Sequence, residues 1–416
     1  MSVRGTSALA LALLVAVPGP ARALDPAALD LQLRLRAAPE GTWAQRGSPF
    51  APAAELAGIG RERGRGEAEL RVRGRSLTAD LSARTTSLAG SRPASDGVVN
   101  ELFAEAELAG QHFTLGKKVL PWDVGFGFRP LDVIQQEARR AFLPFALEGV
   151  PLVAWERFGE RGATAVVWAN PLRGRAPRAR EDESWALRHY QRLGGLDLHA
   201  VGRWSRRTLG EAGAAAAVVL GDAVELHGSA LYQRRLERPG DARLDPGAAP
   251  IAAADPARVR VSQDAVAALV GLTLTPGRDL SFVAEGWIDP AAPTASEWKA
   301  MAALARSQRA LLSGDTVPRP LVLANLAWGT RAFGGRSLVR ENVYLRATQR
   351  WDRLEPEVDV LWTPADGGLV ATASLGWEGE HSRLGAGVRV YAGRRDAAAR
   401  LMPQGGVFHA SWEVSW

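Results

Sequence analysis

The strict alternation of residues 408–416 constrains the fold of this chain more than any other feature. Apolar and polar side chains take turns along it: Phe408, Ala410, Trp412, Val414 and Trp416 alternate with His409, Ser411, Glu413 and Ser415. Successive side chains of a β-strand point to opposite faces, so the pattern predicts a strand with one apolar and one polar face. Half-buried strands of soluble sheets and strands that face lipid both show this period, so both interpretations stay open for this segment alone.

The same alternation recurs along most of the chain in segments of about ten residues, divided by Gly, Pro, Asp or Asn turns. The first is residues 29–36, where Leu29, Leu31, Leu33 and Leu35 alternate with Asp30, Gln32, Arg34 and Arg36. We expect further strands at or near Glu67–Arg75, Ser76–Leu88, Asn100–Leu108, Phe113–Gly116, Leu152–Phe158, Ala163–Asn170, Trp185–Gln191, Gly195–Trp204, Ala214–Leu220, Val224–Glu237, Ala265–Leu274, Leu280–Ile288, Leu321–Trp328, Leu338–Arg346, Glu357–Trp362, Val370–Trp377 and Leu384–Tyr391.

Acidic residues on the polar faces indicate what those faces meet. Glu101, Glu105 and Glu107 share one strand face, opposite Leu102 and Leu108. Carboxylates at this spacing cannot point into a dry core unless they are paired, whereas a water-filled lumen accommodates them. The sequence therefore predicts an all-β fold, a transmembrane antiparallel up-and-down β-barrel of roughly 16–18 strands with long loops and one short loop helix. A soluble periplasmic β-protein is the rival fold.

Residues 1–23 have the features of a secretory signal peptide. Arg4 lies in a short basic head, residues 8–17 are apolar, Pro18-Gly19-Pro20 follows, and Ala21-Arg22-Ala23 is a small-x-small cleavage site. The apolar run is too short to span a bilayer, which disfavours a retained anchor. We expect the barrel to comprise residues 24–416.

Composition excludes several classes of function. The chain has no cysteine, which excludes disulfides and thiolate metal sites. Removal of Arg4 and Arg22 lowers the formal net charge from +6 to +4, a weak excess that indicates no nucleic-acid surface. The six histidines are scattered, and no Gly-x-Ser-x-Gly, His-Glu-x-x-His or phosphate-loop motif occurs. We therefore expect no catalytic residue, metal site or cofactor.

Three stretches depart from the strand pattern. Residues 37–64 are rich in Gly, Pro and Ala and suggest a loop or a plug, and Arg238–Arg260 suggests an extracellular loop. In residues 294–313, apolar side chains recur at helical spacing after a Thr-Ala-Ser-Glu start that resembles a capping box. We expect a helix within a loop here, and the sequence leaves open whether it covers the pore, lies on the surface or folds inward.

Residues 116–151 combine closely spaced glycines, prolines, aromatic residues and charges, which is typical of a loop with a fixed conformation. We predict that this segment folds inward and narrows the lumen, with opposite charges producing a transverse field across the passage. The residues predicted at this constriction are Lys117, Lys118, Arg129, Arg139 and Arg140, set against Asp123, Asp132 and Glu137. The alternative is that these charges only lock the loop through ion pairs.

Residues 116–151 resemble the alginate-export porins and a related group of uncharacterised outer-membrane proteins, through a Gly-basic-x-Val…Trp element followed by Pro-x-Asp. The relatives carry a Gly-Arg pair where this chain has Gly116-Lys117-Lys118. The strand at 408–416 resembles the closing strand of outer-membrane barrels, which implies that Phe408, Trp412 and Trp416 act as an insertion signal for the barrel-assembly machinery.

These resemblances imply a bacterial outer-membrane protein, surrounded by lipid after export through the periplasm. The expected function is a porin-like channel for passive passage of a polar or anionic small solute or polymer. The alternative is a non-conducting barrel that acts as an assembly, secretion or anchoring partner.

Overall fold

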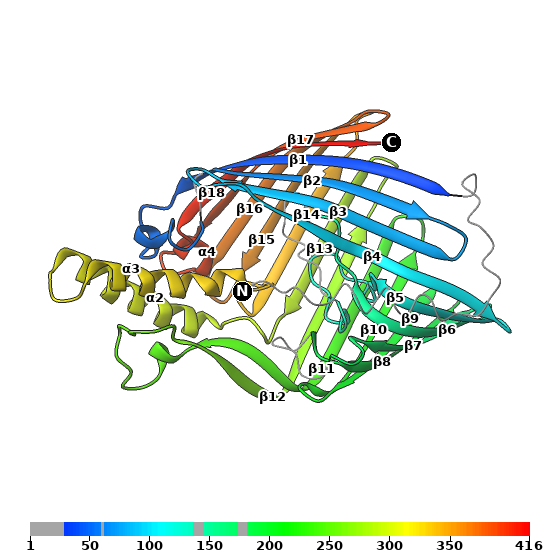
Figure 1. Ribbon diagram of the computed structural model, residues 1–416, viewed down its shortest axis with the longest axis horizontal. Coiled ribbons are helices and arrows are strands. Elements are labelled where there is room, and N and C mark those ends of the chain that lie inside the picture. The colour runs from blue at the N-terminus through cyan, green and yellow to red at the C-terminus, as the bar shows by residue number, and fades with distance from the viewer. Residues whose placement is uncertain (1–28, 60–61, 136–144, 174–180) are drawn as a thin grey trace.

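Eighteen antiparallel strands form one closed ring (Figure 1). The computed structural model describes residues 29–59, 62–135, 145–173 and 181–416, so the predicted signal peptide at 1–23 lies outside the described residues. Each strand pairs with the next one along the chain, and β1 pairs with β18 to close the ring. The predicted up-and-down barrel of roughly 16–18 strands is therefore confirmed.

The strands are longer than the predicted segments in several places. Their bounds are β1 (Asp30–Ala44), β2 (Glu62–Arg73), β3 (Leu77–Leu88), β4 (Ala94–Leu108), β5 (Gln111–Lys118), β6 (Val150–Phe158), β7 (Gly162–Ala169), β8 (Ser184–Leu193), β9 (Leu196–Ser205), β10 (Leu209–Leu220), β11 (Val224–Asp241), β12 (Ala257–Leu274), β13 (Leu280–Ile288), β14 (Glu341–Gln349), β15 (Leu354–Thr363), β16 (Gly368–Glu378), β17 (Ser382–Gly393) and β18 (Gln404–Ser415). The predicted loop at Arg238–Arg260 is thus shorter, because β11 and β12 pair as far as Asp241 and Ala257.

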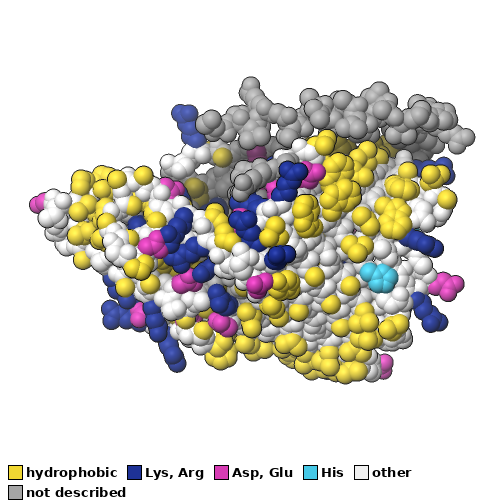
Figure 2. Space-filling model, turned by 90° about the horizontal axis from the view of Figure 1, so that it is seen from below, with side chains coloured by type: hydrophobic (Ala, Val, Ile, Leu, Met, Phe, Trp, Pro, Cys, Tyr) yellow, Lys and Arg dark blue, Asp and Glu magenta, His cyan; other side chains and the backbone are white. Residues whose placement is uncertain are grey.

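The two faces of the wall differ as the alternation predicts. On β13, Phe282 and Ile288 are exposed on the outer side, whereas Val283, Glu285 and Trp287 are buried on the inner side. Hydrophobic side chains cover broad areas of the outer wall (Figure 2). An apolar outer face is the arrangement that lipid requires of a barrel.

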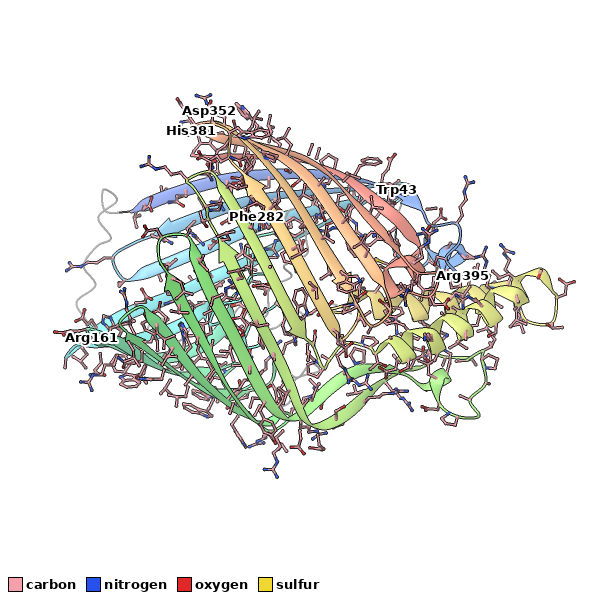
Figure 3. All side chains as sticks on the ribbon, turned by 180° about the vertical axis from the view of Figure 1, so that it is seen from behind. Trp43, Arg161, Phe282, Asp352, His381 and Arg395 are labelled. Atoms are coloured by element: carbon pink, nitrogen blue, oxygen red, sulfur yellow. The ribbon has the colours of Figure 1, made fainter. Side chains whose placement is uncertain are left out.

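The two ends of the barrel carry different connections. Short turns close one end, where Arg161, Asp352 and His381 lie, and the longer loops gather at the other end with Arg395 (Figure 3). Transmembrane barrels place short turns on the periplasmic side and long loops outside the cell. The helices of the described residues all lie in connections at the long-loop end. The described residues between β5 and β6, which belong to the same end, contain no helix.

The connection between β13 and β14 contains two α-helices rather than the single predicted one. The helix expected at 294–313 is present as α2 (Ala295–Ala310), and α3 (Arg319–Gly329) follows it. The strand predicted at Leu321–Trp328 is therefore wrong. Its apolar run fits a short strand as well as a helix, but α3 buries Val322 and Leu326, four residues apart, and this spacing is helical. The strand predicted at Leu338–Arg346 begins only at Glu341.

The described residues of the long-loop end also contain shorter helical segments. They are η2 (Ala51–Ala53), η4 (Ala242–Leu244), η5 (Leu311–Ser313), η6 (Thr330–Gly334) and α4 (Ala398–Leu401). Among the described residues, no helix has both the length and the hydropathy needed to cross a membrane.

Helix α2 joins loops from nearly opposite sides of the ring. The Arg309 guanidinium donates to the carbonyl of Ser48 in the β1–β2 loop, and the Gln308 amide donates to the carbonyl of Pro250 in the β11–β12 loop. The Trp298 ring is fully buried, and its N–H donates to the Leu338 carbonyl at 2.6 Å. The helices therefore form a packed bridge across the long-loop end of the barrel.

Candidate functional site

The segment after β5, residues 119–135, crosses the interior of the barrel. The Phe126 ring stacks on Tyr344 of β14 with the ring centroids 6.3 Å apart, and the Arg346 guanidinium lies over the same ring at 4.6 Å. Strands β5 and β14 stand nine places apart in a ring of 18. The segment thus starts at one side of the lumen and contacts the wall on the opposite side.

Apolar side chains of the segment fill the space against the inner wall. Trp122, Phe128, Leu131 and Val133 are all buried, and they belong to one cluster with inward-facing residues of β6 to β13. Burial of these side chains removes apolar area from water and fixes the path of the segment. The segment is therefore a packed part of the interior.

Asp123 and Asp132 hold the segment in its conformation. One Asp132 oxygen accepts the backbone N–H groups of Trp122 and Asp123, at 2.8 and 3.1 Å. The Asp123 carboxylate accepts the N–H groups of Val124 and Leu131 and the hydroxyl of Ser229 on β11. Burial raises the pKa of the Asp123 carboxyl, although its backbone donors oppose that shift. The two carboxylates therefore fix the loop through hydrogen bonds to its backbone and to the wall, and these contacts are not the ion pairs of the alternative.

The predicted basic residues have local partners as well. Lys117 Nζ lies 2.6 Å from Glu148 Oε1, and Lys118 Nζ lies 2.7 Å from Glu105 Oε1. Arg129 donates to the Gly125 carbonyl at 2.7 Å and keeps about a fifth of its side chain exposed, 21%. Glu137, Arg139 and Arg140 lie outside the described residues. The structure thus brings Asp123, Arg129 and Asp132 together and leaves the two lysines at the end of β5.

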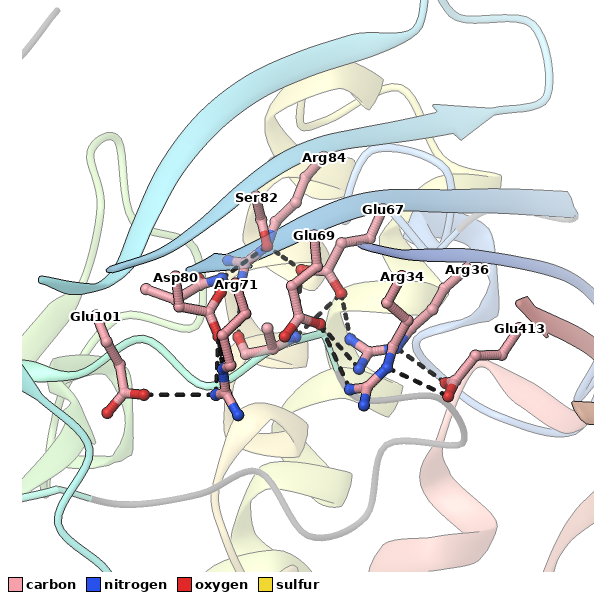
Figure 4. Close-up of polar contacts among 12 residues, drawn as sticks. Arg34, Arg36, Glu67, Glu69, Arg71, Asp80, Ser82, Arg84, Glu101 and Glu413 are labelled. Atoms are coloured by element: carbon pink, nitrogen blue, oxygen red, sulfur yellow. Dashed lines mark hydrogen bonds and ion pairs between the residues drawn. The ribbon is translucent and has the colours of Figure 1, made fainter. Parts of the chain in front are cut away.

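A charged wall on β1 to β4 and β18 was missed as a site by the sequence reasoning (Figure 4). Glu67 is its centre: its carboxylate lies 2.6 Å from Arg36 Nη1 and 2.9 Å from Arg84 Nε. Arg36 also contacts Glu69 and Glu413, each at 3.0 Å. Alternation predicts that these residues share the inner face, but only strand register shows which of them pair.

A second group continues this charged wall toward β4. Arg71 Nη2 lies 2.9 Å from Asp80 Oδ2 and 3.4 Å from Glu101 Oε2. The Arg71 and Arg34 side chains are 30% and 38% exposed, whereas those of Asp80 and Glu69 are 2% and 7% exposed. Arg34 and Arg71 are therefore more exposed than the carboxylates of Glu69 and Asp80 with which they pair.

The returning end of the β5–β6 connection binds this charged wall. The Ala146 N–H donates to Glu67, and the Ala146 carbonyl accepts from Arg84 at 2.6 Å. The Phe145 ring lies under the Arg84 and Arg65 guanidinium groups at 5.1 and 5.6 Å. Described parts of one connection therefore contact both sides of the lumen.

Phe408, Trp412 and Trp416 lie outside this interior site. They are 61%, 46% and 59% exposed, with Phe408 and Trp412 on the apolar side of β18. Among the described residues, no group of three or more His, Asp or Glu side chains is arranged to hold a metal ion.

Comparisons with known proteins support the fold. No family model and no curated protein matches this chain. OccK8 (OprE) of Pseudomonas aeruginosa is similar with a TM-score of 0.53 and 10% identity, over 93% of this chain and 97% of OccK8. OpdK of Pseudomonas aeruginosa, solved with vanillate, gives 0.53 and 12% identity over 93% and 99%. OccAB3 of Acinetobacter baumannii gives 0.53 and 9% identity over 94% and 99%. At these identities the likeness concerns the fold, a closed barrel of the porin type.

Proposed function

We propose that this chain is a porin-like channel of the bacterial outer membrane, through which polar solutes pass passively with a preference for anions. The observation that carries the proposal is the charged wall, in which the Arg34 and Arg71 side chains are more exposed than the Glu69 and Asp80 side chains with which they pair. Fixed charges in a low-dielectric passage raise the local concentration of solutes of opposite sign. The structural similarity to OpdK, which was solved with vanillate, supports a small solute.

Two further expectations stay part of the proposal. Export through the periplasm requires that residues 1–23 act as a signal peptide. The resemblance of residues 116–151 to the alginate-export porins suggests an anionic polymer as a second class of solute. The proposed role includes no catalytic step and no cofactor.

One observation favours the rival function, a barrel that does not conduct and serves an assembly, secretion or anchoring partner. Residues 119–135 cross the lumen, and α2 bridges the long-loop end. Conductance depends on the open area that these two crossings leave.

Current measurements in planar lipid bilayers test both functions. We expect conductance steps from the refolded wild-type protein. In a salt gradient, the sign of the reversal potential should indicate selectivity for anions. The double variant Arg34→Gln/Arg71→Gln should shift the reversal potential toward cations, because Asp80 and Glu101 lose Arg71 and Glu69 keeps only Arg36 as a partner. Arg161→Gln, at an exposed short turn, is the matched control and should change nothing.

The two negative outcomes have different meanings. An unchanged reversal potential in the double variant would refute the assignment of anion preference to the charged wall. Absence of any conductance steps from the folded wild-type protein would refute the channel and favour the partner role.

A further inference from the structure

Glu285 of β13 binds the crossing segment at the point farthest from its origin. Its side chain is fully buried on the inner wall. Oε1 accepts the backbone N–H of Phe126 and Oε2 accepts that of Gly127, both at 2.6 Å. Hydrogen bonds to an ionised carboxylate are shorter and stronger than neutral ones.

We propose that Glu285 is the positioning residue that holds the tip of the crossing segment, residues 125–128, against the far side of the lumen. This inference rests on the proposed channel function, because the position of the tip then sets the cross-section of the passage. Asp123 and Asp132 shape the segment through contacts that are mostly internal to it, whereas Glu285 joins it to the opposite wall.

The backbone around Glu285 is built for this contact. A Cβ at Gly127 would lie 3.2 Å from Glu285 Oε2, and one at Gly125 would lie 2.0 Å from the Phe128 carbonyl oxygen. A side chain at either position would disturb the tip or push it from the carboxylate. Gly125 therefore permits the tight turn within the tip, and Gly127 permits the approach of the tip to the wall.

His227 of β11 forms a further hydrogen bond with the Glu285 carboxylate. Its Nε2 lies 2.9 Å from Glu285 Oε1, and its Nδ1 lies 3.4 Å from Glu225 Oε1. A carboxylate only accepts hydrogen bonds, so the imidazole donates from Nε2. Gly271 of β12 leaves the space for this ring, since a Cβ there would lie 2.2 Å from His227 Nε2.

The substitution Glu285→Gln removes the charge and one acceptor oxygen while it keeps the size of the side chain. Glutamine keeps the shape but offers one acceptor oxygen, and its NH₂ group meets one of the two backbone N–H donors. Glu225→Gln is the matched control, because Glu225 also contacts His227 but, among the described residues, makes no hydrogen bond with the tip.

Hydrogen–deuterium exchange on the folded full-length protein in lipid tests the proposal without any measurement of current. We expect amides of residues 126 and 127 to exchange roughly tenfold faster in Glu285→Gln, as loss of a charged hydrogen bond implies, and at the wild-type rate in Glu225→Gln. If Glu285→Gln does not fold, Gly127→Val leaves the wall intact and should accelerate the same amides. Wild-type exchange in the folded variant would overturn the proposal.

Single-channel recording then links the tip to the passage. We expect larger open-channel current fluctuations in Glu285→Gln than in the wild type or Glu225→Gln. Faster exchange with unchanged fluctuations would overturn the claim that the tip sets the cross-section. A wild-type protein that passes no current would end the proposed function, while the exchange result would still decide whether Glu285 holds the tip.

Discussion

At the scale of single residues, glycines of the wall set how closely the crossing segment and the wall approach, because glycine has no side chain. Gly213 of β10 lies beneath Leu131, where a Cβ would come within 2.5 Å of Leu131 Cδ2. Gly271 of β12 plays the same part for His227 and for the Cγ of Glu285. Close packing leaves little room for added atoms at such contacts. Gly213 thus leaves space on the inner wall for Leu131, and Gly271 leaves space for His227 and Glu285.

The substitution Gly271→Ala should destabilise the barrel by about 1–3 kcal/mol, the usual cost of overpacking. The added methyl group displaces His227 and therefore weakens the support of Glu285. The midpoint of a urea titration in lipid, followed by tryptophan fluorescence, measures this change. Gly202→Ala is the control, because a Cβ at Gly202 meets nothing within 4 Å. Equal midpoints for the two variants would contradict the packing argument.

At the scale of elements, α2 is held at its start and along its buried face. The Thr294 hydroxyl accepts the Glu297 N–H, and the Glu297 carboxylate accepts the Thr294 N–H, which completes a capping box. Glu297 also pairs with Arg238 and Arg260 of the extended β11–β12 hairpin. Burial alone would raise the pKa of Glu297, but the hydrogen bonds from Arg238 and Thr294 outweigh it and lower that pKa. The helix is therefore fixed to the barrel at neutral pH.

The substitution Trp298→Ala should release α2 while the barrel stays folded. Replacing a fully buried tryptophan by alanine lowers the free energy of unfolding by about 3–5 kcal/mol. Trp298 packs within the bridge formed by α2 and α3, so the bridge is the part that is destabilised. Limited trypsin digestion should then cut after Lys299, Arg306 or Arg309 in the variant and spare the wild type. Lys299→Gln serves as the control, since Lys299 is exposed on the same helix. A variant as resistant as the wild type would show that the bridge does not depend on Trp298.

At the scale of the whole molecule, the contact between β1 and β18 turns a sheet into a closed tube. Leu33 and Trp416 exchange two backbone hydrogen bonds, of 3.1 and 2.9 Å, at one end of this seam. Arg36 pairs with Glu413 further along it, and the Trp43 and Phe408 rings meet at 4.9 Å near the other end. Closure removes the sheet edges that lipid would not tolerate.

If Trp416 is part of an insertion signal, Trp416→Ala should lower the amount of folded protein in the outer membrane of cells. Refolding of the purified variant into detergent should stay at the wild-type level, because the seam bonds of residue 416 are made by its backbone. Trp416→Phe keeps an aromatic ring and should restore assembly. The shift in gel mobility on heating measures the folded fraction, and wild-type assembly of Trp416→Ala would exclude the signal role.

Several elements were predictable from local pattern alone. The alternation at Leu29–Arg36 and Phe408–Trp416 indicated β1 and β18, and the Thr-Ala-Ser-Glu start indicated α2. The run Leu321–Trp328 misled because a short apolar stretch fits either period, and packing beside α2 selected the helix. The unusual composition of residues 116–151 was also visible, whereas its contacts with Glu285 and Tyr344 were not.

The sequence by itself determined which side chains share a face of each strand, because alternation is a local property of the chain. Tertiary structure alone decided that Glu285 meets Phe126 and that Arg36 meets Glu413, since those partners lie 159 and 377 residues apart. Ring closure brings such residues together, and no local period encodes which strands become opposite or which register they adopt.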